Sequence, residues 1–277
     1  MDNQLLWHDF YREIDKPDEQ IDLAKASLCY AKAEDPDLDI QKYLAALDAI
    51  AIEVESQLSG KTYPLKVIKA VNFELYDGWG FQGNSKDYYN PDNSFLDRVI
   101  ERRVGIPITL SVIYLAVAQR INFPMVGIGM PGHFLIRPDF EDAGIFVDAF
   151  ARGEILFEQD CQARLSQIYQ QPVELNPDWL APVSNKQILA RMLNNLKFIY
   201  LHKQQIDKAV SIISGIIKLF PDSAEEIRDR GLLYYQTQRW QEAVVDLEYY
   251  LKIAPNDRDT DTIQFLLEKI ERVYRSI

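Results

Sequence analysis

The sequence predicts an α+β protein whose two ends are helical and whose middle contains a small antiparallel sheet. Apolar residues recur at helical spacing up to about residue 60, short alternating β-type runs lie between residues 125 and 150, and a helical pattern repeats after residue 184. We therefore expect an N-terminal helical segment (1–60) packed on a core domain (61–183), followed by an all-α array (184–277).

Composition and charge exclude several classes of function. The 277 residues are 47% apolar and carry a net charge of −12, with 14 acidic and 5 basic side chains in residues 1–60 alone. Without a basic stripe we expect no nucleic-acid partner, because phosphate binding needs clustered lysine and arginine. The N-terminus is too polar for a signal peptide, and the apolar stretch Ile106–Ala118 is too short to cross a bilayer. We expect a cytoplasmic protein that does not bind membranes.

Two helices are expected in the N-terminal segment. They are LAKASLCYAKAE and LDIQKYLAALDAIAIEVESQL, and Asp35-Pro36-Asp37 separates them. The second helix has apolar side chains at i, i+3, i+4 and i+7 spacing: Ile40, Tyr43, Leu44, Leu47, Ile50 and Ala51. Such a pattern buries one face against a core and leaves the acidic residues on a solvated face.

The middle part changes from helical to extended patterns. We expect helices over Leu65–Leu75 and Phe95–Arg103, and a third that begins at Pro107, directly after Gly105, and continues to Arg120. Beyond it, MVGIGM, HFLIRP and IFVDAF have the length and the β-type residues of short strands.

The last part contains a repeated helix–turn–helix unit with a period of 34 residues. The second copy has Gly231, Tyr234, Ala243, Leu247, Tyr250 and Pro255, and the first has Lys197, Tyr200, Ala209, Ile213, Ile216 and Pro221 at the corresponding offsets. This spacing is typical of tetratricopeptide (TPR) repeats, here over 190–223 and 224–257, and we expect the amphipathic segment Thr260–Ser276 to be the capping helix.

The first helix of each TPR repeat lines a concave groove, which makes a protein or peptide the expected partner. Asn195 occupies a groove position, Asn194 and Arg191 are near it, and the residue equivalent to Asn195 in the second repeat is Asp229. These polar side chains form a candidate partner-binding surface, although a solvated helix face would contain the same residue types.

One histidine and one aspartate are candidates for catalysis. If HFLIRP and IFVDAF form a hairpin around DFEDAG, its loop length predicts that His133 faces Asp148, Leu135 faces Phe146 and Arg137 faces Gly144. Facing side chains lie about 5 Å apart at Cβ, so the carboxylate can orient the imidazole. The alternative is a structural histidine whose hydrogen bonds are satisfied.

A His–Asp pair becomes catalytic beside a nucleophile, which in papain-like sites is a cysteine at a helix N-terminus. The helix that begins at Pro107 has no cysteine there, and its nearby hydroxyls are Thr109 and Ser111. Either hydroxyl is a possible nucleophile, and either can instead cap or pack the helix. Cys161 follows the pair in the chain, and Cys29 lies within an apolar helix.

No metal site or cofactor is expected. Two cysteines and the three scattered histidines His8, His133 and His202 match no zinc pattern. The glycines at 127, 129 and 132 lie within strand-like segments and open no helix, unlike a dinucleotide-binding loop.

The middle part resembles the transglutaminase-like core, in which a helix with a cysteine precedes strands with a histidine and an aspartate. GFQGNSKDYYNPDNSFLDRVIERRVGIPITLSVIYLAVAQR, with MPGHFLIR and FVDAF, is similar to the bacterial SirB-type family, which joins such a domain to TPR repeats. The resemblance implies that His133 and Asp148 are the superfamily histidine and aspartate. It places the superfamily cysteine at or next to Pro107, which implies that thiol chemistry is absent.

These observations give a leading hypothesis and two alternatives. The leading hypothesis is a non-catalytic regulatory scaffold that recruits a protein partner through its TPR groove. The first alternative is an acyl-transfer enzyme with Ser111 or Thr109 as nucleophile, His133 as base and Asp148 as orienting residue. The second is a cleft that binds a ligand without turnover, for which the candidate residues are Arg102, Arg103 and Arg137.

Overall fold

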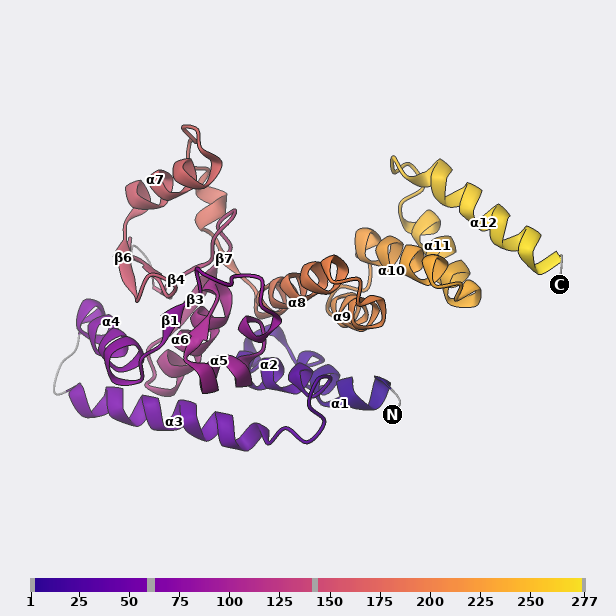
Figure 1. The fold of residues 1–277 in the computed structure, drawn as a ribbon. Helices are drawn as coiled ribbons and strands as arrows, with labels where there is room; N and C mark the ends of the chain where they lie inside the picture. The colour runs from indigo at the N-terminus through magenta and orange to yellow at the C-terminus, as the bar shows by residue number, and fades with distance from the viewer. Residues whose placement is uncertain (1–2, 59–62, 141–143, 276–277) are drawn as a thin grey trace. The chain divides into compact units, whose positions relative to one another are not determined.

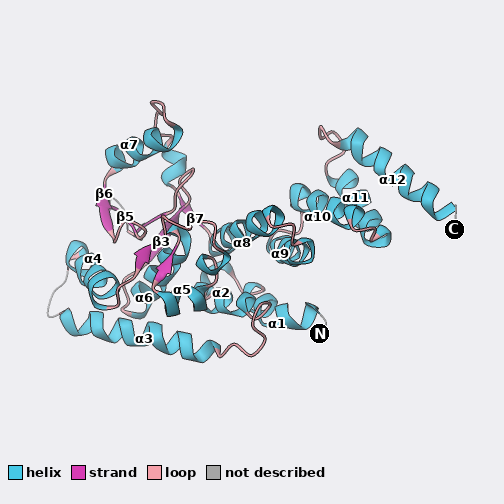
Figure 2. Ribbon diagram, in the orientation of Figure 1, coloured by secondary structure: helices cyan, strands magenta, loops and turns pink. Residues whose placement is uncertain are grey.

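The protein is described by a computed structural model that covers residues 3–58, 63–140 and 144–275 (Figure 1). The chain forms two compact units, the first ending at Met192 and the second beginning at Leu193. The first unit combines helices with a small sheet and the second is entirely helical in its described residues (Figure 2), which confirms the α+β class. None of the described helices is both long enough and apolar enough to cross a membrane.

Two of the N-terminal helices begin at an acidic capping residue. Asp22 accepts a hydrogen bond from the backbone of Lys25, and Asp39 accepts from the backbone of Gln41 and Lys42, as N-cap residues do. A short 3₁₀ turn, η1, precedes the second helix. The elements are α1 (Asn3–Ile14), η1 (Asp18–Gln20), α2 (Leu23–Ala31) and α3 (Ile40–Gln57).

The segment that leads to the sheet is partly irregular. The helix expected over Leu65–Leu75 is α4 (Pro64–Asn72), and a single π-helical turn, η2 (Phe73–Gly78), continues it. Two short segments, β1 and β2, pair in parallel, with Gly83 opposite Gly105. The remaining elements are β1 (Gln82–Gly83), η3 (Pro91–Asn93), α5 (Leu96–Arg102) and β2 (Val104–Gly105).

Helix α6 (Pro107–Arg120) has the bounds that its sequence predicts and forms the centre of the first unit. Its residues from Pro107 to Ala118 are all buried. The hydroxyl of Thr109 accepts a hydrogen bond from the backbone N–H of Ile106 at 3.1 Å, which supplies the helix start with its cap.

The sheet has five antiparallel strands in the order β6-β5-β4-β3-β7. Helix α7 (Glu158–Tyr169) packs on the face that includes Ile128, Leu135 and Phe146, while α6 contacts β3 and β4, so the two helices lie on opposite sides (Figures 1 and 2). A 3₁₀ turn, η4 (Pro177–Leu180), precedes the last strand. The strands are β3 (Met125–Ile128), β4 (Leu135–Pro138), β5 (Phe146–Asp148), β6 (Glu154–Leu156) and β7 (Pro182–Val183).

The predicted hairpin forms, but its predicted register is wrong by two residues. Ile136 pairs with Val147, so Leu135 faces Asp148 and not Phe146, and His133 precedes the first strand. A shift of two keeps each side chain on its own face, because side chains alternate with period two. The loop length was a poor guide to the register, and part of that loop, residues 141–143, lies outside the described residues.

The second unit consists of paired helices that match the predicted repeats. Ala209 and Ala243 are fully buried, and a side-chain carbon at Gly231 would lie 2.7 Å from Leu247, so α10 and α11 need a residue without a side chain there. Its helices are α8 (Asn185–His202, shared with the first unit), α9 (Ile206–Leu219), α10 (Ala224–Gln236), α11 (Trp240–Ile253) and α12 (Thr260–Arg275). The expected end of the cap at Ser276 lies outside the described residues.

Candidate functional site

The structure brings His133 and Asp148 together despite the register difference. A turn from Met130 to His133, closed by a 3.1 Å backbone hydrogen bond and with Gly132 at φ +71°, points the chain into β4. His133 Nε2 lies 2.8 Å from Oδ2 of Asp148, the last residue of β5. The imidazole thus reaches its carboxylate diagonally across the two strands, on the face covered by α7.

Asp148 is fully buried, and both its oxygens have partners. Oδ1 accepts hydrogen bonds from the backbone N–H groups of Phe150 at 2.9 Å and Ala151 at 3.1 Å. Oδ2 contacts His133 and also the guanidinium of Arg164. The carboxylate therefore organises the turn after β5 as well as holding the imidazole, and its charge is shared among four donor groups.

Arg164 is the residue of this site that our sequence analysis missed. It extends from α7, donates to Asp148 through Nη1, and donates to Glu154 Oε2 through Nη2 at 2.7 Å. Asp148 and Glu154 face one another in the β5–β6 pairing, so one guanidinium links two strands to the helix above them. No short motif marks such a residue; the signal was an arginine in the helix that follows the strands.

The electrostatics of the site keep the imidazole neutral. Burial, followed by the positive charges of Arg164 and Arg191, lowers the pKa of His133 from 6.5 to about 4, although Asp148 is adjacent. Arg191 donates to the backbone carbonyls of His133 at 2.7 Å and Met130 at 3.2 Å, and its guanidinium lies over the ring of Phe134. Burial lowers the pKa of Arg191 as well.

The two hydroxyl candidates are buried in α6, and neither forms a hydrogen bond with His133. The hydroxyl of Thr109 can donate to the carbonyl of Asn93, at 2.9 Å, or to that of Ile106, at 3.1 Å. The same oxygen accepts from the backbone N–H of Ile106. Ser111 is fully buried, and its Oγ has no hydrogen-bond partner among the described residues. Pro107 occupies the first turn of the helix, where the resemblance locates the superfamily cysteine.

Neither cysteine supplies a thiolate. Cys29 is buried in α2, and Cys161 is buried against the sheet by α7. Burial raises the pKa of both thiols from 9.0 to about 11. Within the described ranges, His, Cys, Asp and Glu side chains form no group of three that could hold a metal ion.

The three candidate ligand-binding arginines are bound to local groups. Arg102 approaches the Asp92 carboxylate at 3.5 Å. Arg103, the residue directly after α5, lies over the rings of Trp79 and Phe81 and donates to the carbonyl of Ile100 in that helix. Arg137, on β4, donates to the Pro138 carbonyl at 3.0 Å. The described structure does not bring these guanidinium groups to one binding cleft.

The candidate partner-binding residues separate into two groups. Asn194 is exposed and Asn195 is half-buried in the second unit, and neither side chain has a hydrogen bond to a described residue. Arg191 belongs to the first unit, where backbone carbonyls bind it. Asp229 and Glu226 of α10 each lie 2.7 Å from Lys197 Nζ, so the unusual lysine of the first repeat pairs with the second.

Comparison with known proteins agrees with this architecture. The sequence pattern of the transglutaminase-like superfamily matches residues 41–194, and that of the tetratricopeptide repeat matches residues 196–268. A UPF0162 protein of Xylella fastidiosa strain Temecula1 is 34% identical over 262 residues, which cover 89% of each chain.

Two further relatives differ in how much of their own length matches this chain. Protein SirB1 of Salmonella typhimurium is 27% identical over 227 residues, covering 82% of this chain and 83% of SirB1. F-box only protein 21 of Pongo abelii is 31% identical over 240 residues, covering 80% of this chain but 36% of that protein. The match to the SirB-type family indicated by the sequence is confirmed. The chain therefore belongs to the transglutaminase-like superfamily, within the family of bacterial UPF0162 and SirB1 proteins.

Proposed function

We propose that this protein is a non-catalytic, cytoplasmic regulatory scaffold. In this proposal residues 61–183, with the helices of 1–60, form a transglutaminase-like domain that retains its histidine and aspartate for structure. Residues 184–277 recruit a protein partner through the TPR groove, because TPR repeats generally mediate protein–protein interaction. The transglutaminase-like and TPR composition and the SirB1 relatives fit a scaffold or regulatory role.

The observation that carries the proposal is the binding of Arg164 to Asp148. Acyl transfer with a histidine base needs a carboxylate that stabilises the imidazolium as it forms. Here the same oxygen that contacts His133 already contacts the guanidinium of Arg164. Burial and the positive charge of Arg191 further oppose a protonated ring. An imidazole with a pKa of about 4 is a weak base, and its protonated form is disfavoured in the transition state.

The chemistry of the helix start supports the same conclusion. Proline at position 107 has no nucleophilic atom, and Thr109 uses its hydroxyl to bind backbone groups. Ser111 is fully buried. No observation favours the alternative of an acyl-transfer enzyme over the scaffold.

Hydrolysis assays test the absence of catalysis. We expect the full-length protein to hydrolyse activated esters and fluorogenic peptide amides no faster than a His133→Gln variant. His202→Gln is the matched control, because His202 is an exposed histidine on α8 in the second unit, outside the transglutaminase-like unit that contains Asp148. Turnover that is lost in His133→Gln and retained in His202→Gln, with unchanged circular dichroism, would show that the protein is an enzyme.

Affinity purification from the organism's own proteome tests the scaffold. Truncation at residue 184 is unsuitable, because Ile188 and Met192 at the start of α8 are buried in the first unit. Substitution of Asn194 and Asn195 by lysine alters the groove without removing the helix. We expect co-purifying proteins to be lost from this variant and retained by Val245→Lys, which changes a 66% exposed residue on α11. Equal retention by both variants would exclude the groove.

A further inference from the structure

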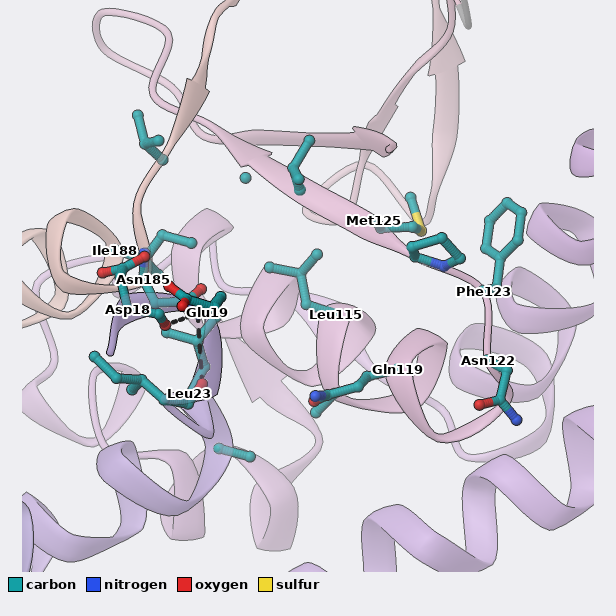
Figure 3. Close-up of a pocket in the computed structure, with 17 residues that line it drawn as sticks. Asp18, Glu19, Leu23, Leu115, Gln119, Asn122, Phe123, Met125, Asn185 and Ile188 are labelled. Carbon is teal, nitrogen blue, oxygen red and sulfur yellow. Dashed lines mark hydrogen bonds between the residues drawn. The ribbon is translucent and has the colours of Figure 1, made fainter. Parts of the chain in front are cut away.

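A cavity of about 520 Å³ lies in the first unit, away from His133 and Asp148. Its volume is within the range of sites that bind small ligands or peptide side chains. Figure 3 shows it between the C-terminal half of α6, the start of β3, the η1 turn and the start of α8. Leu115, Phe123, Met125 and Ile188 contribute apolar walls, while Asp18, Glu19, Gln119 and Asn122 contribute polar groups.

One wall of the cavity is an incompletely paired strand. In an antiparallel ladder, hydrogen-bonded pairs alternate with non-bonded pairs. The bond from Asp139 N to Pro124 O, at 2.9 Å, fixes this alternation for β3 and β4, so the N–H and C=O of Met125 point away from β4. They point to the side where β7 pairs with β3.

Strand β7 ends before it reaches Met125. Its described pairs are Gly127 with Val183 and Ile128 with Pro182, and the chain then enters α8 at Asn185. Pro182 has no N–H, so Gly127–Val183 is the hydrogen-bonded pair, and Met125 is the next residue of β3 to face this side. No described strand pairs with Met125 there. The edge is therefore a template for one more short strand.

The charge of the cavity is acidic. Its only ionisable lining residues among those described are Asp18 and Glu19. Asp18 is occupied, since its oxygens accept from the backbone N–H groups of Asn185 at 2.8 Å and Lys186 at 2.9 Å. Glu19 is exposed, and no described salt bridge includes it. The surrounding residues 1–60 also have nine more acidic than basic side chains.

We propose that this cavity binds an extended peptide segment of a partner protein, in which a lysine or arginine lies near apolar side chains. The segment adds as a short strand beside β3, exchanging main-chain hydrogen bonds with Met125. Its apolar side chain enters the space between Leu115 and Ile188, and its basic side chain pairs with Glu19. This site is in the transglutaminase-like unit and does not depend on the TPR groove or on the absence of catalysis.

The main-chain edge is what favours a peptide over a small amine. A small cationic ligand would use Glu19 and the apolar walls but would have no need of the Met125 backbone. An acidic segment is disfavoured, because both ionisable lining residues carry negative charge.

The test selects peptides from a phage-displayed random library on the full-length protein and measures their affinities as synthetic peptides. Met125→Pro removes the outward N–H without breaking a hydrogen bond to β4, and it also removes the methionine side chain. Met125→Ala is its matched control and keeps the N–H. We expect Met125→Pro to weaken binding about five- to tenfold relative to Met125→Ala. Thermal unfolding of both variants verifies that the sheet is intact, and a peptide methylated on the pairing nitrogen tests the same bond from the partner's side.

Charge reversal tests the second contact. We expect Glu19→Lys to weaken the selected basic peptides about three- to tenfold, with the loss diminishing at high salt. Glu55→Lys, an equal change at an exposed position on α3, should leave the affinity unchanged. Two results would overturn the proposal. The first is selected peptides that bind Met125→Pro as tightly as Met125→Ala, since they would not use the strand edge. The second is a library that yields no peptide whose affinity depends on Glu19.

Discussion

Acidification should destabilise the protein in part through one buried histidine, His133. Its pKa is about 4 in the folded protein and 6.5 in an unfolded chain. Between these two values the unfolded state binds the proton that the folded state does not, so stability falls as the pH falls. The stability that the neutral His133 contributes is therefore fully present above pH 6.5 and lost once the pH falls below about 4. A difference of this size corresponds to about 3 kcal/mol of unfolding free energy.

The magnitude follows from the surroundings of the ring. The His133 side chain is only 12% exposed, so solvent screens its interactions weakly. Burial is the larger cause of the lowered pKa, and the charges of Arg164 and Arg191 come next. Arg164→Gln should therefore raise the pKa of His133 by about one to two units, since Asp148 then faces the imidazole without a competing cation. The imidazole stays buried in this variant, so the loss of stability on acidification becomes smaller but does not disappear.

The assay is chemical denaturation at a series of pH values, with His133→Gln as the reference. Other carboxyl groups titrate in both proteins, so the difference between their stability curves isolates the histidine. An NMR titration of the imidazole gives the pKa directly, and comparison with His133→Gln assigns the signal. Parallel stability curves for the two proteins, or an imidazole pKa near 6.5, would refute the reasoning from burial and charge.

Three further predictions concern other parts of the chain. Cys29 and Cys161 should resist alkylation by iodoacetamide at slightly alkaline pH until the protein is unfolded, because burial raises the pKa of both thiols to about 11. Rapid labelling of the folded protein, counted by mass spectrometry, would contradict this. Lys197→Met should cost about 2 kcal/mol in denaturant unfolding, because Glu226 of α10 loses its lysine partner while Asp229 keeps only Arg228. Exposed Lys203→Met should have little effect. Gly153→Ala should lower the free energy of unfolding by about 2 kcal/mol, since φ is +73° and the new carbon would collide with the side chain of Asn72 in α4. An unchanged melting temperature would show that the turn can relax.

The helical repeats were predictable because their constraints are local. Ala209 and Ala243 recur at a fixed spacing, and both are fully buried where helices approach closely. The start of α6 was predictable for a similar reason, since Pro107 is suited to a first helical turn. In both cases the pattern that determines each helix is contained in a short stretch of sequence.

The site was only partly predictable because its determinants are distant in the chain. His133 and Asp148 were identified, yet their strand register was not, since it depends on pairing across the whole sheet as well as on the loop. Arg164 reaches Asp148 from a separate helix, and this contact changes the chemistry of the pair. Without it, the same two residues favour a catalytic interpretation.

The shortest strands were not predicted either. Strand β7 consists of Pro182 and Val183 alone, too few residues for an alternating pattern. The parallel strands β1 and β2 are equally short, with two residues each, and show no alternating pattern either. The unfilled edge at Met125 exists because β7 is so short, so no pattern in the sequence predicts this edge either.

The cap that Asp18 supplies to α8 has a consequence for how the chain folds during synthesis. The carboxylate and the N–H groups that it binds are separated by 167 and 168 residues. The N-terminal helices therefore leave the ribosome long before their last native partner exists. Contacts of such long range slow the final step of folding, and the apolar faces of the early helices are exposed in the meantime. The first unit should thus become protease-resistant late, only after the start of α8 has emerged.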